Sequence, residues 1–123
     1  MVRQEARRIL LVGSDASHDV EKQFVHADCH VVKTNAGAAA VGYAKRNSFS
    51  AAVLMSTGRE MDLAETALNL RDIQPSLEII ILVDRTPDKE MEVQADAVLR
   101  AIPKSRILPK SDLKSYLASS ESG

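Results

Sequence analysis

Short apolar runs alternate with amphipathic segments along almost the whole chain of 123 residues. The runs hold few polar residues, as expected of strands buried on both faces of a parallel sheet. The segments between them place apolar residues three and four positions apart, which is typical of helices with one buried side. Five runs stand out, at residues 9–12, 31–32, 51–55, 79–83 and 106–108. The alternation predicts an α/β protein in which right-handed crossovers build a three-layer sandwich around a parallel five-stranded sheet.

Capping and stop residues mark the ends of five expected helices. The hydroxyl groups of Ser17 and Ser111 can cap the first and the last of them, and Thr86 opens the fourth with a proline in its first turn. Pro75 and Pro103 stop the third and the fourth, because proline cannot continue a helix. The expected helices span about residues 17–27, 36–46, 62–72, 86–102 and 111–117.

The composition predicts an aliphatic core in one domain. Apolar residues make up 45% of the chain, but aromatic residues only 3%, and tryptophan is absent. Isoleucine, leucine, valine, alanine and methionine must therefore fill the interior, and a chain of this length fits a single core. Gly37 and Gly42 in the second expected helix indicate either close packing or weakened local stability.

The net charge and the cysteine content limit the partners and the cellular compartment that we expect. The formal net charge is −1, which argues against binding to nucleic acid or to an anionic membrane. Cys29 is the single cysteine and cannot form an internal disulfide, so a reducing cytoplasm is the expected compartment. No apolar run approaches the roughly 20 residues that a membrane span requires. We expect a short lead-in at residues 1–6, a domain at residues 7–118, and a polar tail or the start of a linker at residues 119–123.

Several short motifs follow one another in a defined order and spacing. Met61 and Asp62 follow Met55 by six and seven residues, and further motifs lie at residues 9–12, 34–37, 74–77 and 108–111. In order and in spacing, these motifs resemble those of response regulator receiver domains of the chemotaxis-regulator-like family, in which a Met-Asp pair follows the phosphoacceptor in the same way. The resemblance covers about residues 7–118. It implies a flavodoxin-like, doubly wound (βα)5 sandwich with strand order 2-1-3-4-5, and a role in two-component phosphorelay signal transduction.

The reaction of that family needs four groups at the carboxyl edge of the sheet. Two acids after the first strand bind Mg²⁺, and an aspartate after the third strand accepts the phosphoryl group. A serine or threonine at the end of the fourth strand and a lysine after the fifth strand contact the added phosphate. The resemblance places Gly13 and Ser14 at the two acid positions, and neither side chain is an anionic ligand. Asp15 lies one position too far along and supplies only one carboxylate.

The remaining pocket positions depart from the family in the same direction. Met55 stands at the nucleophile position, and moving the alignment to Ser56 would break the spacing to Met61 and Asp62. Val83 replaces the hydroxyl, and Ile107 replaces an aromatic residue that takes part in switching. Lys110 is retained, although the usual Lys-Pro order is reversed. These departures predict that phosphorylation by the standard route is lost. We therefore expect no catalytic residue, no metal, no cofactor and no enzymatic activity. Such a chain would be an atypical receiver, or pseudo-receiver.

The leading hypothesis for function is therefore phosphorylation-independent protein–protein interaction. The resemblance implies a binding face formed by the fourth helix, the fifth strand and the fifth helix. It would contact a protein partner in a signalling pathway or a second copy of the chain. The residues expected on this face are Lys89, Glu92, Val93, Arg100, Lys104, Arg106, Lys114 and Tyr116.

Three alternatives to this hypothesis involve a bound ligand or metal. The degenerate pocket could instead bind a small metabolite, which would make the chain a ligand sensor. A flavin carrier would need a phosphate-binding loop, and the segment at residues 13–17 has one glycine and no lysine. His26, Cys29 and His30 have a spacing superficially like that of metal ligands. A helix that ends near Ala27 would point them in different directions, and no fourth ligand is evident, so we expect no metal site.

Overall fold

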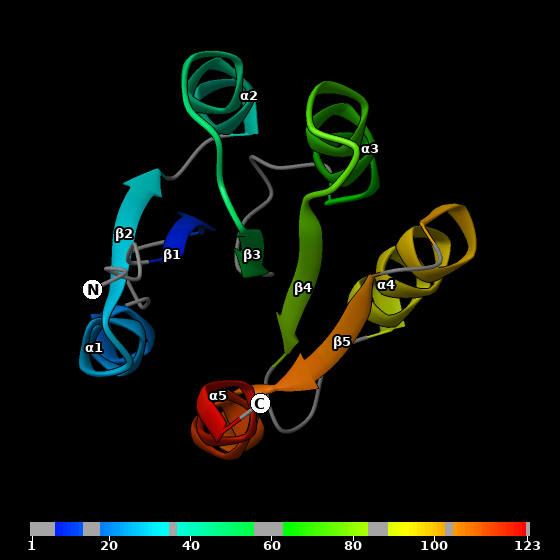
Figure 1. Ribbon diagram of the computed structural model, residues 1–123. Helices are drawn as coiled ribbons and strands as arrows, with labels where there is room; N and C mark the ends of the chain where they lie inside the picture. Colours follow the sequence, from blue (N-terminus) through cyan, green and yellow to red (C-terminus); the bar gives the residue numbers. More distant parts are fainter. Residues whose placement is uncertain are drawn as a thin grey trace.

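The computed structural model describes residues 7–13, 18–34, 37–55, 63–83, 89–102 and 105–122. Strands and helices alternate through these residues, as the sequence predicts (Figure 1). The elements are β1 (Arg7–Val12), α1 (His18–His26), β2 (Cys29–Thr34), α2 (Gly37–Arg46), β3 (Ala51–Met55), α3 (Leu63–Ile73), β4 (Glu78–Val83), α4 (Lys89–Ala101), β5 (Arg106–Pro109), the 3-10 turn η2 (Lys110–Asp112) and α5 (Leu113–Ser122).

All strand pairs are parallel, and their order is β2-β1-β3-β4-β5, which confirms the expected doubly wound topology. The middle of the sheet is apolar throughout: Leu11 pairs with Val53, and Val53 pairs with Ile80. Every residue of β3 is buried, as expected of a strand covered on both faces. Both edge strands are more exposed, and β5 is only four residues long.

The sheet separates two hydrophobic clusters, because successive side chains of a strand point to opposite faces. Helices α2, α3 and α4 cover one face and α1 and α5 cover the other (Figure 1). The α2/α3/α4 cluster contains Leu10, Val12, Ala40, Ala44, Phe49, Ala52, Leu54, Ala67, Leu70, Leu77, Ile79, Ile81, Val83, Val98 and Ile102. The α1/α5 cluster contains Ile9, Leu11, Val20, Phe24, Ala51, Val53, Met55, Ile80, Leu82, Leu113 and Leu117. Aliphatic side chains dominate both clusters, as the composition predicts.

The side chain of Gln74 connects three segments just after α3. Its Nε2 donates hydrogen bonds to the carbonyl of Ala44 at 2.8 Å and to that of Asn47 at 2.6 Å. Its Oε1 accepts a hydrogen bond from the backbone N–H of Phe49 at 2.9 Å. These contacts satisfy backbone groups at the end of α2 and in the loop that leads into β3. Gln74 therefore fixes the entry of β3 into the sheet.

The carboxyl-terminal part of the fold differs slightly from the expectation. Ser111 lies inside η2 rather than at the cap of α5, because the chain makes a tight 3-10 turn before the helix begins at Leu113. Helix α5 continues to Ser122 and so includes residues 119–122, which we expected in a polar tail. The division of the chain into lead-in, domain and tail stays a prediction. Within the ranges described above, no helix has the length and apolar character needed to cross a bilayer.

Candidate functional site

The candidate pocket lies at the carboxyl edge of the sheet, where parallel strands end together. Strands β1, β3 and β4 end at Val12, Met55 and Val83. Val12 pairs with Leu54, and Met55 pairs with Leu82. The residue that follows β1 therefore stands beside the end of β3, at the edge where open parallel sheets bind ligands.

Gly13 and Met55 are in direct contact at this edge. The N–H of Gly13 donates a hydrogen bond to the carbonyl of Thr34 at 2.9 Å, which holds the backbone in place beside β2. A Cβ atom built on Gly13 would lie 2.6 Å from the Cβ of Met55, closer than two such carbons approach in proteins. The position beside Met55 therefore has no room for a side chain unless the backbone moves.

Met55 is a buried core residue in this structure. Its exposed fraction is 0%, and it packs in the α1/α5 cluster. Val83 is also buried but belongs to the α2/α3/α4 cluster on the other face. The structure thus brings Gly13 and Met55 together and places Val83 among different neighbours. A flexible thioether suits such an irregular apolar site.

The other pocket positions are only partly described. Ile107 is half-buried and packs against the α2/α3/α4 cluster. Lys110 begins η2, directly after β5, but its side chain lies outside the described part of the structure. Ser14, Asp15 and Ser56 also lie outside the described residues. Their contribution to the pocket stays a prediction.

The expected interaction face runs along the β5 edge of the sheet, between α4 and α5 (Figure 1). Val93 on α4 has an exposed fraction of 68%, which is high for a large apolar side chain. Arg100 on α4 and Lys114 on α5 are also exposed. The side chains of Lys89 and Glu92, and the whole of Lys104, lie outside the described residues.

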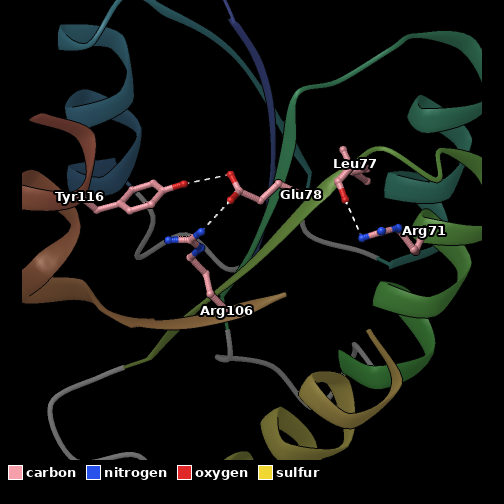
Figure 2. Close-up of polar contacts among 5 residues, drawn as sticks. All are labelled: Arg71, Leu77, Glu78, Arg106 and Tyr116. Carbon is pink, nitrogen blue, oxygen red and sulfur yellow. Dashed lines mark hydrogen bonds and ion pairs between the residues drawn. The ribbon is translucent and has the colours of Figure 1, made fainter. Parts of the chain in front are cut away.

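Arg106 and Tyr116 from the same predicted face form a polar network with Glu78 (Figure 2). The hydroxyl of Tyr116 donates a hydrogen bond to Oε1 of Glu78 at 2.9 Å. Nη2 of Arg106 lies 3.3 Å from Oε2 of Glu78, and its Cζ lies 5.1 Å from the centre of the Tyr116 ring. The network joins the first residues of β4 and β5 to α5, so it lies at the amino edge of the sheet.

Burial raises the pKa of Tyr116 above its ordinary value, and the carboxylate of Glu78 adds to this rise. The carboxylate accepts the phenolic hydrogen and repels the phenolate, so both effects favour the protonated phenol. The positive charges of Arg106 and Arg7 act in the opposite direction and partly offset the rise. Tyr116 therefore acts as a hydrogen-bond donor at neutral pH.

Sequence reasoning missed Glu78 as a functional candidate. It is the one acidic residue of β4 and immediately precedes an otherwise apolar run. An acid at the first position of a buried strand indicates a partner at the sheet edge, because charged groups in such places are rarely left unpaired. The partners themselves, Arg106 and Tyr116, are 28 and 38 residues away in the chain, so spacing alone does not reveal them.

Histidine and cysteine side chains form no evident metal cluster in the described parts of the chain. No three His, Cys, Asp or Glu residues there lie close enough together to hold an ion. The thiol of Cys29 donates instead to the carbonyl of Ala27 at 3.8 Å.

Comparison with known proteins gives a clear result for the fold. No family model matches the sequence, and no curated protein matches it. Solved structures do match it. The adenylate cyclase from Rhodopirellula baltica is 24% identical, with a TM-score of 0.72 over 94% of this chain and 87% of that one. The receiver domain of the sensor histidine kinase PA1611 from Pseudomonas aeruginosa is 20% identical, with a TM-score of 0.72 over 94% and 97%. The chemotaxis response regulator CheY4 of Vibrio cholerae is 17% identical, with a TM-score of 0.71 over 96% and 98%.

These likenesses establish the class of fold. The chain has the fold of response regulator receiver domains, the CheY-like variety of the flavodoxin-like sandwich. The PA1611 receiver domain carries a magnesium ion in its active-site cleft. In this chain, Gly13 and Met55 lie at the carboxyl edge of the sheet.

Proposed function

We propose that this chain is a receiver-like signalling module that acts through phosphorylation-independent protein–protein interaction. It is not an enzyme in this proposal, and it needs no metal or cofactor. The contact between Gly13 and Met55 is the observation that carries the proposal. Gly13 stands at a position where a phosphorylated receiver has a metal-binding acid, and Met55 stands at the position of the nucleophilic aspartate.

The chemistry of Met55 supports this proposal. A phosphoacceptor must offer a nucleophilic oxygen, and a thioether has neither a hydroxyl nor a carboxylate to attack phosphorus. The side chain is also fully buried, so an incoming phosphodonor could not reach it without opening the core. An acid at position 13 would add a Cβ for which the present backbone has no room beside residue 55.

The α4–β5–α5 edge is the proposed binding face. Val93 offers an exposed apolar contact on α4, and Arg100 on α4 and Lys114 on α5 add exposed positive charges to the same expected face. Protein interfaces commonly combine apolar contacts with polar and charged groups at their rim. The partner in this proposal is another protein of a two-component pathway or a second copy of the chain.

The absence of phosphorylation can be tested directly. The protein is incubated with acetyl phosphate and Mg²⁺, and its intact mass is measured. We expect no addition of a phosphate. An addition that disappears after replacement of Met55 or Ser56 would overturn the proposal.

The binding face can be tested with a matched pair of variants. Val93→Glu alters the proposed face, whereas Leu68→Glu alters another exposed apolar residue, on α3, with an exposed fraction of 45%. Partner capture and the oligomeric state in size-exclusion chromatography are measured for both. We expect Val93→Glu alone to abolish association. Equal effects of the two variants, or none from either, would contradict the assignment of this face.

A further inference from the structure

Exposed basic side chains gather at the amino edge of the sheet, on the face that α2 covers. Arg8 is the second residue of β1 and points to this face, because Leu10 and Val12 of the same strand pack in the α2/α3/α4 cluster. Lys45 and Arg46 lie in the last turn of α2, and both are exposed. Helix α2 leads from the carboxyl end of β2 to the amino end of β3, so its last turn lies at the same edge (Figure 1). We call Arg8, Lys45 and Arg46 the basic corner.

Backbone contacts hold the two parts of the basic corner together. The N–H of Ser50 donates a hydrogen bond to the carbonyl of Arg8 at 2.8 Å. Ser50 follows Arg46 by four residues, which limits the separation of their Cα atoms to about 14 Å. The segment between them is fixed by the hydrogen bonds of Gln74 described above. On its other side, Arg8 pairs in register with the exposed His30 of β2. Arg8 and the end of α2 are therefore neighbours on one surface.

The charges of the basic corner have no acidic partner in the described part of the protein. The side chains of Arg8 and Lys45 form no ion pair or hydrogen bond there. The guanidinium group of Arg46 lies over the ring of Tyr43, with its Cζ 5.6 Å from the ring centre. This contact uses the flat face of the guanidinium group and orients it, so the N–H groups at its edge can still bind an anion.

Helix stabilisation explains only part of this arrangement. Basic residues in the last turn of a helix complement its dipole, which accounts for Lys45 and Arg46. Arg8 lies at the start of a strand, where no such effect applies. Asp28 and Asp72 are exposed acids at the same edge, but within the described residues neither forms an ion pair with the corner. Three cations thus stay open to a partner, in a chain whose net charge is −1.

We propose that the basic corner binds an acidic segment of a partner protein, whose carboxylates pair with Arg8 and Arg46 while Lys45 adds positive charge. Guanidinium groups bind carboxylates through paired N–H donors, which gives orientation as well as attraction. Nucleic acid fits the corner less well, because proteins bind single strands by stacking the bases on aromatic rings. The aromatic residue here, Tyr43, is half-buried, and Arg46 covers its ring.

The basic corner and the α4–β5–α5 edge lie at opposite ends of the strand order, with β1 and β2 near one and β5 at the other (Figure 1). An acidic segment bound at the corner therefore leaves the α4–β5–α5 edge free for a second partner. This inference goes beyond the proposed function and does not depend on it, because it uses none of the residues of that edge.

The test is an NMR titration of the ¹⁵N-labelled protein at low ionic strength, where charge interactions are least screened. The first probe is an eight-residue peptide of alternating glutamate and serine, and the second has glutamine in place of each glutamate. We expect saturable shifts of the amide signals of Lys45, Arg46 and Ser50, with a Kd for the acidic peptide below about 1 mM. The glutamine peptide should bind at least about 10-fold more weakly, because it lacks the charge. An oligothymidylate of the same charge as the acidic peptide should also bind more weakly than that peptide, because Tyr43 is not open to stacking.

Matched variants complete the test. Arg8→Gln and Arg46→Gln each remove a charge from the corner, whereas Lys22→Gln removes one from the exposed surface of α1, on the other face of the sheet. We expect each corner variant to bind the acidic peptide about 10-fold more weakly, and Lys22→Gln to bind it like the native protein. Arg46→Lys keeps the charge without the planar fork, so its affinity should lie between those of Arg46→Gln and the native protein.

Four results would overturn the proposal. They are the absence of saturable shifts at the corner, equal affinity for the two peptides, equal effects of Lys22→Gln and the corner variants, and tighter binding of the oligothymidylate than of the acidic peptide. Shifts confined to Val93 and Lys114 would place the binding on the α4–β5–α5 edge and would overturn it as well.

Discussion

Replacing Gly13 by alanine should destabilise the protein through a single contact. The new Cβ would lie 2.6 Å from the Cβ of Met55, whereas ordinary contacts between such atoms begin near 3.4 Å. Gly13 does not have a positive φ, so the backbone conformation itself accepts alanine. Overpacking of this kind costs roughly 1–3 kcal/mol, and the reduced freedom of the unfolded chain returns about 0.4–1 kcal/mol. We expect a net loss of about 1–2 kcal/mol.

Gly42→Ala is the matched control. Gly42 lies inside α2, and a Cβ built on it has no neighbour within 4 Å. Of the two interpretations of this glycine, weakened local stability is therefore the correct one. Alanine should stabilise the helix by roughly 0.5–1 kcal/mol. Urea unfolding followed by circular dichroism measures both variants, and the midpoints should move in opposite directions at constant slope.

A double variant identifies the atom responsible. Met55→Ala costs roughly 2–5 kcal/mol by itself, because it leaves a cavity, but it keeps the Cβ that Gly13→Ala would meet. The cost of Gly13→Ala should therefore persist in the Met55→Ala background. If Gly13→Ala is as stable as the native protein while Gly42→Ala is stabilised, the close approach of Gly13 and Met55 is refuted. If its cost disappears in the double variant, the outer part of the Met55 side chain is the cause.

Three further predictions follow from described contacts. Gln74→Glu should lower the free energy of unfolding by roughly 2–4 kcal/mol, because a carboxylate cannot donate to the carbonyls of Ala44 and Asn47. The control Gln23→Glu on α1 introduces the same charge and should lower the free energy of unfolding much less in the same urea denaturation assay. The pKa of Tyr116 is raised in the folded protein, so the stability that it contributes is complete below its ordinary pKa near 10.0 and is lost as the pH rises through the folded value. Absorbance titration of the Tyr43→Phe variant should show this late ionisation, and a tyrosine that ionises at or below its ordinary value would contradict the network around Glu78. Asp28 has a φ of 61° in the turn after α1. Asp28→Gly should therefore remove a backbone strain of up to about 1 kcal/mol and raise the midpoint of thermal unfolding, and a lower midpoint would contradict this.

The sheet could be predicted from the sequence because its strands are buried on both faces. The apolar runs at residues 51–55 and 79–83 correspond to β3 and to all but the first residue of β4. The stripe formed by Val20 and Phe24 is buried as expected, since helical spacing alone determines which residues share a face. Strand order required the resemblance to a known family, because periodicity says nothing about which strands are neighbours.

The side-chain contacts could not be predicted in the same way. Gln74 contacts residues 25 to 30 positions away, and Glu78 meets Arg106 and Tyr116, which are 28 and 38 positions away. Such pairings depend on the crossovers that bring distant segments together. The contact between Gly13 and Met55 has the same origin, because it depends on the pairing of β1 with β3. Sequence reasoning identified both residues of this contact but did not predict that they touch.

The edges of the sheet restrict how two copies of the chain can associate. An exposed strand normally offers a row of N–H and C=O groups to which another strand can add. Strand β5 has only four residues, begins with a charged arginine and ends with Pro109, which has no N–H to donate. Strand β2 carries the exposed His30 and Lys33 at the opposite edge. Growth of a continuous sheet across molecules is therefore disfavoured at both edges, and a dimer through the α4–β5–α5 edge would depend on side-chain contacts instead of strand addition.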